Sequence, residues 1–166
     1  MKMLSRDYDV KYVDIVDGTF TYDRRYIVDF CNALNSEDID IKWRCTARYD
    51  NLDEGLIDLM AKSNCKGLYF GLESGSQKIL NDINKQITLK NIIKTSEMVY
   101  QSGITSVTSV IIGLPDETHK DIEDTLKLME RIKTSVFDIN SFVPLPGTRF
   151  YDGQEIDWLT VGFKSL

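Results

Sequence analysis

Short runs of β-branched and aromatic residues alternate along the chain with stretches whose apolar residues have helical spacing. Each run is bounded by turn-forming residues, as is typical of strands, and the runs cover residues 10–16, 41–47, 67–72, 104–112 and 136–143. Between the runs, apolar residues recur every three or four positions, as at Ile122, Leu126 and Met129. The chain is therefore expected to alternate one strand with one helix.

The residues at the expected helix starts support this alternation. Asp53 is placed to cap one helix and Thr88 a second, while Thr118 followed by Asp121 resembles a capping box for a third. The longest connection, between the third and fourth runs, has room for two helices, at about 77–84 and 89–102. Strands joined through helices pair in parallel by right-handed crossovers, so we expect a parallel sheet.

These patterns predict a single α/β domain, because no linker, charge block or shift in composition divides the chain. The five runs are expected to form one parallel sheet in sequential order. A complete eight-fold barrel needs roughly 250 residues, whereas this chain has 166. We therefore expect a curved sheet that forms part of a barrel.

Composition and charge exclude several classes of partner. The chain is 42% hydrophobic and 28% charged, with a net charge of -6 that gives no general attraction to nucleic acid or anionic membranes. The longest uncharged run, 98–115, is too polar to span a membrane, and the first nine residues lack the apolar segment of a secretory signal. A cytoplasmic protein with no nucleic-acid and no membrane partner is expected.

Residue types that commonly carry metal or nucleophilic chemistry are few. The three cysteines, Cys31, Cys45 and Cys65, are spaced too widely for a metal knuckle and are expected to be buried thiols without disulfides. His119 is the single histidine, and no partner carboxylate is evident for it. Because the sequence also has no GxSxG elbow and no P-loop, hydrolysis and phosphoryl transfer are disfavoured.

Charged side chains follow the first two runs at the carboxyl ends, where parallel α/β sheets bind their ligands. Asp17 follows the first run and could accept hydrogen bonds from a ligand ammonium group, or it could simply form a turn. Arg48 follows the second run and could hold a carboxylate through both sides of its guanidinium, or lie on the surface.

The third and fourth runs end in residues suited to a nucleoside. Glu73 and Ser74 could bind the neighbouring hydroxyls of a ribose, or they could cap the next helix. Gly113 and Pro115 could form a plain turn, or could let a flat ring lie close to the backbone. A parallel sheet would bring these residues to the same rim as Asp17 and the guanidinium after the second run.

Four segments at the strand ends carry a family resemblance: Val-Asp-Gly-Thr-Phe at 16–20, Gly-Leu-Glu-Ser-Gly-Ser at 71–76, Ile-Gly-Leu-Pro-Asp-Glu-Thr at 112–118 and Pro-Leu-Pro-Gly-Thr-Arg-Phe-Tyr at 144–151. In their order and spacing, the chain resembles the radical S-adenosylmethionine (SAM) superfamily over about residues 10–152. The Glu-Ser-Gly-Ser segment, followed by Leu80, Lys85 and Thr88, is most similar to the cobalamin-dependent branch, which includes anaerobic tetrapyrrole cyclases and radical methyltransferases.

The resemblance implies a partial barrel and a specific chemistry. In the family, a CxxxCxxC loop after the first strand binds three irons of a 4Fe–4S cluster, and the methionine part of SAM chelates the fourth iron. An electron from the cluster breaks the sulfonium bond and gives a deoxyadenosyl radical, which abstracts hydrogen from a substrate. The cofactors implied for the full-length protein are SAM, the cluster and cobalamin.

The resemblance also implies positions for the parts of SAM. Asp17 falls in the region that meets the methionyl amine, Glu73 and Ser74 in the ribose region, and 113–115 in the adenine region. The expected cofactor-binding set is Asp17, Thr19, Arg48, Glu73, Ser74, Gly113, Leu114, Pro115 and Pro144.

The sequence departs from the family pattern in two ways. It contains no CxxxCxxC, and Gly18 stands where the family frequently has a second Asp. We therefore expect residues 1–166 to be one truncated radical SAM core that holds the second to sixth of six strands, with the cluster loop and the cobalamin domain upstream. By itself the chain is expected to have no catalytic residue, no metal ligand and no bound cofactor.

Two alternatives to a truncated radical SAM core stay open. The chain could be a non-catalytic nucleotide-binding or regulatory module on a degenerate barrel, or a small doubly wound domain of other ancestry. The enzyme hypothesis implies a small-molecule substrate that the sequence does not identify. If the strand at 10–16 is a sheet edge, self-association through it is expected, unless residues 1–9 fold over that edge.

Overall fold

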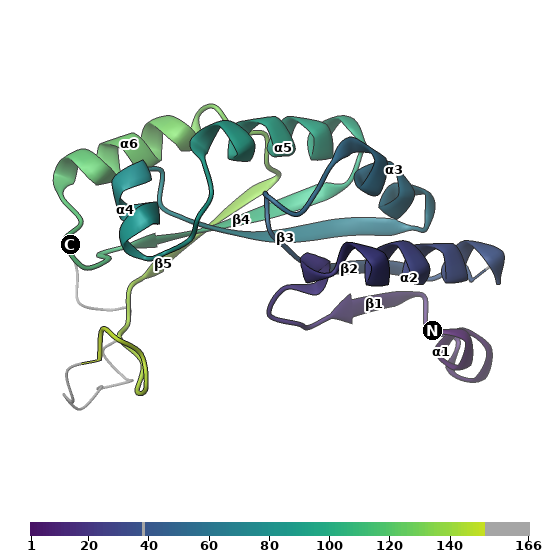
Figure 1. Cartoon of the computed structure of the whole chain (residues 1–166). Coiled ribbons are helices and arrows are strands. Elements are labelled where there is room, and N and C mark those ends of the chain that lie inside the picture. Colours follow the sequence, from purple (N-terminus) through teal and green to yellow (C-terminus); the bar gives the residue numbers. More distant parts are fainter. Residues whose placement is uncertain (38, 152–166) are drawn as a thin grey trace.

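The computed structural model describes residues 1–37 and 39–151, which form one sheet with helices on one face (Figure 1). The strand order is β1-β2-β3-β4-β5 and every neighbouring pair is parallel. The strands are β1 (Tyr12–Ile15), β2 (Lys42–Ala47), β3 (Cys65–Glu73), β4 (Thr105–Ile112) and β5 (Val136–Ser141). The predicted sequential parallel α/β sheet is confirmed, and residues 152–166 of the expected domain lie outside the described residues.

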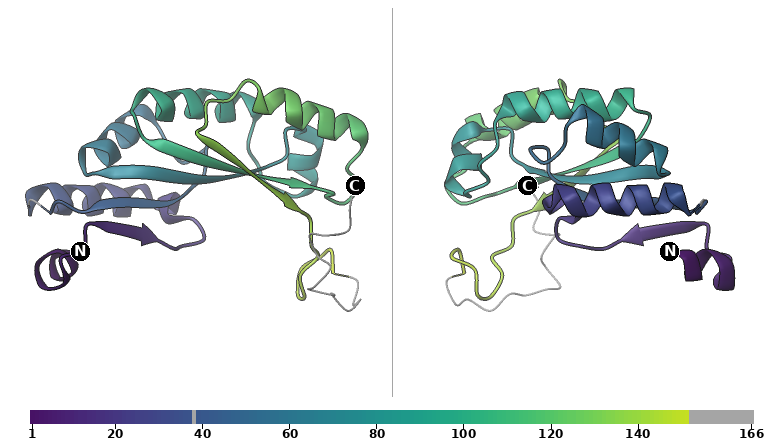
Figure 2. Two further views of the ribbon diagram at one scale, coloured as in Figure 1. Left: turned by 180° about the vertical axis from the view of Figure 1, so that it is seen from behind. Right: turned by 45° about the vertical axis from the view of Figure 1, so that its right-hand side comes forward.

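The helices that connect the strands lie on one side of the sheet (Figure 2). They are α2 (Arg24–Ser36), α3 (Glu54–Lys62), α4 (Gln77–Asp82), α5 (Leu89–Gln101) and α6 (His119–Met129). Helix α1 (Lys2–Tyr8) precedes β1, and a short 3-10 helix, η1 (Phe20–Tyr22), follows β1. The connection from β3 to β4 contains two helices, as predicted.

Local capping explains where these helices begin. Asp53, Thr88 and Thr118 each accept a hydrogen bond from a backbone N–H in the first turn of α3, α5 and α6. Asp121 completes the capping box of α6, because its carboxylate accepts a bond from the backbone N–H of the capping threonine. By contrast, α1 has no side-chain cap and no buried residue, so the sequence offered no signal for it.

The hydrophobic core lies between the sheet and the helices. Trp43 is fully buried, and its indole Nε1–H donates to the carbonyl oxygen of Ser63 at 2.7 Å, which satisfies its single donor. Phe20 and Phe30 pack edge-on against the indole at centroid distances of 6.0 and 5.2 Å. This aromatic cluster fixes α2 and η1 over β2.

The three cysteines are buried and unpaired, one each in α2, β2 and β3, as predicted. Burial raises the pKa of the Cys65 thiol to about 12 and also raises the pKa of Cys31 and of Cys45. The thiols therefore stay protonated at neutral pH and behave as small apolar side chains.

The opposite face of the sheet carries no helix among the described residues (Figure 2). In β2 the alternation buries Trp43, Cys45 and Ala47 beneath the helices and leaves Lys42 and Arg44 exposed. In β2 the helix-free face is therefore polar where the opposite face is apolar.

Within the described residues β1 pairs only with β2, so its other edge is unpaired. Helix α1 lies at the start of this strand and not along it (Figure 1). Tyr12 is 47% exposed and Val16 is 90% exposed. The segment 1–9 thus leaves the edge of β1 open.

Candidate functional site

Four of the sequence-predicted site segments meet at one edge of the sheet. Asp17 follows β1, Arg48 follows β2, Glu73 ends β3 and Gly113 follows β4. Because all four strands run in the same direction, their carboxyl ends lie side by side. Pro144 follows β5 at the same end and is half-buried.

Glu73 has the most constrained backbone of the candidate residues. It is left-handed, with φ of 66°, and sits at a register shift between β3 and β4. Its Oε1 accepts a hydrogen bond from Lys85 Nζ at 2.6 Å, and both side chains are mostly buried. A Cβ at Gly71 would lie 2.3 Å from the same Oε1, so glycine makes room for this ion pair.

Ser74 points away from the edge and into the protein. Its side chain is fully buried, and its hydroxyl lies 3.2 Å from that of Thr125 in α6. A direct ribose contact of the Ser74 hydroxyl does not fit this arrangement. The capping alternative is also wrong, since Ser76 caps α4. Of these two neighbouring residues, only Glu73 presents its side chain at the edge.

The guanidinium of Arg48 is already occupied within the chain. Its Nε and Nη2 donate to Asp50 at 3.0 and 2.8 Å, and Nη2 also donates to the carbonyl oxygen of Lys85 at 3.0 Å. The predicted bidentate grip is present, but on a side chain of the same loop. Arg48 therefore joins the end of β2 to the segment that carries the lysine partner of Glu73.

The loop after β1 is held by the end of β2. Asp17 accepts a hydrogen bond from the backbone N–H of Thr19 at 3.2 Å, so the turn that the sequence left open is present. The Thr46 hydroxyl donates to the carbonyl oxygen of Asp17 and lies 3.3 Å from the backbone N of Phe20. Asp17 remains exposed, and the site of Gly18 is open.

The loop after β4 turns through Gly113, whose φ is 84°. The backbone N–H of Gly113 donates to Glu117 Oε2 at 2.6 Å, Leu114 is buried and Pro115 is half-buried. Glu117 Oε1 is buried and has no hydrogen-bond partner among the described residues. A buried carboxylate oxygen normally accepts a hydrogen bond, so this atom is available to a ligand donor. The sequence analysis did not predict Glu117 as a site residue.

An iron–sulfur cluster does not fit the cysteines of this chain. A cluster needs several thiolates that converge on it, whereas all three thiols are buried beneath helices with raised pKa values. Among the described residues, no group of three or more His, Cys, Asp or Glu could hold a metal ion.

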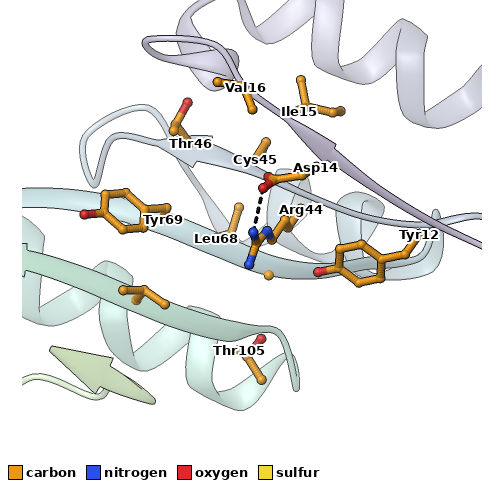
Figure 3. Close-up of a pocket in the computed structure, with 12 residues that line it drawn as sticks. Tyr12, Asp14, Ile15, Val16, Arg44, Cys45, Thr46, Leu68, Tyr69 and Thr105 are labelled. Atoms are coloured by element: carbon orange, nitrogen blue, oxygen red, sulfur yellow. Dashed lines mark hydrogen bonds and ion pairs between the residues drawn. The ribbon is translucent and has the colours of Figure 1, made fainter. Parts of the chain in front are cut away.

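A cavity of about 430 Å³ lies on the helix-free face (Figure 3). It reaches the loop after β1 and, on β3 and β4, the amino-terminal half of each strand. Its lining includes Tyr12, Asp14, Arg44, Tyr69 and Thr105. The sequence analysis did not predict this cavity, although strand alternation places all five of these residues on one face.

A partial parallel barrel with these four loops at its carboxyl edge defines the class of protein. The chain belongs to the radical SAM superfamily, whose family model matches residues 1–129. This confirms the resemblance and the predicted partial-barrel fold. In the described part of the chain, no helix combines the length and the apolar character needed to cross a membrane.

Several relatives and solved structures are similar to most of this chain. A protein of Pyrococcus horikoshii described as an uncharacterized methyltransferase is 30% identical over 92% of this chain and 33% of its own length. A tRNA-2-methylthio-N(6)-dimethylallyladenosine synthase of Corynebacterium jeikeium is 28% identical over 88% of this chain and 30% of its length.

Among solved structures, the radical SAM methyltransferase TsrM from Kitasatospora setae, with cobalamin and an iron–sulfur cluster bound, has the same fold. It superposes with a TM-score of 0.75 at 13% identity, over 87% of this chain and 30% of TsrM. The chain thus spans about a third of the length of each of these proteins.

Proposed function

We propose that this chain provides the SAM-binding strand ends of a radical SAM enzyme, which cleaves SAM reductively to begin radical chemistry. The observation that carries the proposal is the meeting of four loops at the carboxyl edge of β1 to β4, with the Glu73 carboxylate held there by Lys85. A carboxylate that a lysine fixes at one oxygen can accept ribose hydroxyls at the other.

The remaining roles follow from what each loop exposes. Asp17 offers a carboxylate to the methionyl amine, and the backbone at 113–115 offers a surface for the adenine. Glu117 Oε1, a buried acceptor without a partner among the described residues, suits the amino group of the base. Thr19 and Arg48 support these loops through their internal hydrogen bonds. The contact of Pro144 stays a prediction.

The cluster that reduces SAM belongs to another part of the protein in this proposal. When bound, such a cluster supplies the electron that cleaves the sulfonium bond. Its cysteines must come from outside these 166 residues, because the three thiols present are buried and protonated. The similarity in fold to TsrM supports a cobalamin-dependent enzyme of the methyltransferase or cyclase type. By itself the chain is inactive.

The substrate and the compartment are proposed on simpler grounds. A net charge of -6 supports a small-molecule substrate over a nucleic acid. Three unpaired cysteines support a reducing compartment such as the cytoplasm. The alternative of a non-catalytic nucleotide-binding or regulatory module is favoured by one residue, Gly18, which lacks the second carboxylate frequent in the family.

An amide NMR titration of the purified chain with SAM tests the proposal. We expect weak binding, with shifts concentrated at residues 17–20, 71–75 and 113–117. Glu73→Gln should weaken binding by about tenfold, as the loss of a charge-assisted hydrogen bond does. Glu130→Gln, at an exposed carboxylate after α6, is the matched control and should change nothing.

Shifts confined to other positions, or equal affinity for the Glu73 variant, would contradict the binding site. Release of deoxyadenosine by the whole protein, reconstituted without oxygen, distinguishes the enzyme from the module. A protein that binds SAM at this edge, holds no cluster and releases no deoxyadenosine would be the module.

A further inference from the structure

The cavity on the helix-free face owes its depth to one glycine. One register row across β1 to β4 contains Asp14, Arg44, Gly67 and Thr105. In this row Gly67 lies between two longer side chains, Arg44 on β2 and Thr105 on β4. A Cβ at Gly67 would lie 3.1 Å from the Cβ of Arg44. At about 430 Å³, the cavity is within the size range of small-molecule sites.

Arg44 gives the cavity its hydrogen-bond donors. Figure 3 shows its guanidinium directed toward Asp14, and Nη2 donates to Asp14 Oδ2 at 2.6 Å. Within the described residues this is the only hydrogen bond of that guanidinium, whereas Arg48 uses two of its nitrogens. A half-exposed guanidinium with unused N–H donors is matched in geometry to a carboxylate.

The walls of the cavity are suited to a flat apolar body. The rings of Tyr12 and Tyr69 lie on either side of Arg44 (Figure 3), and Val107 lines the same space. The Tyr69 hydroxyl donates to Asp138 at 2.7 Å, which fixes that ring. Lys42 stands opposite Tyr12 in register and adds a second cation on this face. Aromatic walls and a guanidinium with unused N–H donors together favour an aromatic anion.

We propose that this cavity binds a small planar acid, with the carboxylate on Arg44 and the ring system against Tyr69 and Val107. Asp14 competes for the guanidinium and so limits the affinity. The assignment of this acid as the class of substrate of the enzyme rests on the proposed function, whereas the binding itself does not.

Three probes that share one ring system test the proposal: 2-naphthoate, naphthalene-2-carboxamide and 2-naphthylmethylammonium. Each is titrated into the chain and followed by amide NMR. We expect naphthoate to bind about tenfold more tightly than the neutral amide, and the ammonium to bind most weakly. Arg44→Met should remove this preference, and Arg44→Lys should keep part of it.

Two further variants separate charge from shape. Asp14→Asn should tighten naphthoate by about threefold, because it removes the competing carboxylate. Gly67→Val should weaken all three probes by filling the cavity. The matched control is Arg24→Met, which removes a similarly exposed arginine that pairs with Asp53 at 2.7 Å outside the cavity.

Equal affinity for naphthoate and the amide would overturn the proposal, as would an unchanged preference in Arg44→Met. If Arg44→Met or Gly67→Val unfolds, Asp14→Asn still tests the proposal, because weaker binding of naphthoate by that variant would contradict it. None of these titrations contains SAM. If SAM does not bind at the carboxyl edge but naphthoate binds in the cavity, the proposed function is refuted and the acid site is not. If SAM binds at that edge and naphthoate shows no preference for the cavity, the acid site alone is refuted.

Discussion

At the scale of single residues, Glu73 shows how the backbone positions a polar side chain at the carboxyl edge of the sheet. A left-handed glutamate at a register shift is strained relative to an ordinary strand residue. The strain places its carboxylate over Gly71, where Lys85 reaches it at 2.6 Å. The ion pair therefore depends on the absence of a side chain two residues earlier.

Gly71→Ala is expected to break this arrangement. The new Cβ would lie 2.3 Å from Glu73 Oε1 and 3.1 Å from Lys85 Nζ, so the carboxylate must move. We expect the free energy of unfolding to fall by about 1–3 kcal/mol, as in other overpacked sites. Urea unfolding measures the change. Gly18→Ala is the control, because a Cβ there meets nothing within 4 Å; equal stability of the two variants would contradict the interpretation.

At the scale of elements, helix α6 is tied to the loop between β3 and α4. The backbone of Gly75 passes so close to α6 that a Cβ would lie 2.4 Å from the Cα of Thr125. The Thr125 hydroxyl accepts from the N–H of Gly75 at 2.8 Å, and Asp121 accepts from the Ser76 hydroxyl at 2.6 Å. Through these contacts α6, which directly follows the loop after β4, also positions the loop after β3.

The Asp121 contacts make a pH-dependent contribution to stability. Hydrogen bonds from the Ser76 and Thr118 hydroxyls hold the pKa of Asp121 below its ordinary value. Because the folded-state pKa is lowered, the stabilisation is present above the unfolded-state pKa of about 4 and is lost as the pH falls below it. Thermal unfolding of Asp121→Asn should therefore depend less on pH between about 4 and 2 than that of the wild type.

The exposed Asp58 supplies the control for this measurement. Asp58→Asn on α3 should keep the wild-type slope of melting temperature against pH. An identical slope for Asp121→Asn would show that these buried hydrogen bonds do not stabilise the ionised carboxylate.

The sequence predicted the elements better than it predicted the site. Strand runs, caps such as Thr118 and the parallel order followed from local pattern, because each depends on residues close together in the chain. Ser74 turned inward because of Thr125, a partner from a distant segment that no local pattern reveals. Arg48 is held by Asp50 in its own loop and by the distant carbonyl oxygen of Lys85, and only the second contact lies beyond a local pattern. The cavity beside Arg44 was missed for the same reason, since it arises from one register row across four strands.

At the scale of the whole molecule, association is favoured most by the edge of β1 that is unpaired within the described residues. The backbone N–H of Lys42 donates to the carbonyl oxygen of Lys11, so residues 11, 13 and 15 face β2 and the backbone of Tyr12 and Asp14 faces outward. Unpaired strand edges recruit partners, although edge charges such as those of Lys11 and Asp14 oppose this.

We expect the chain to self-associate through this edge, because Tyr12 and Val16 expose apolar surface beside the unpaired backbone groups and α1 does not cover them. Light scattering of the chain at high concentration should give at least twice the monomer mass. The double variant Tyr12→Lys and Val16→Lys should restore the monomer, since lysines on an edge strand disfavour strand addition. Tyr100→Lys, at a 64% exposed tyrosine on α5, should leave association unchanged. A wild-type chain that stays monomeric, or a double variant that associates equally, would show that β1 is protected by means other than pairing.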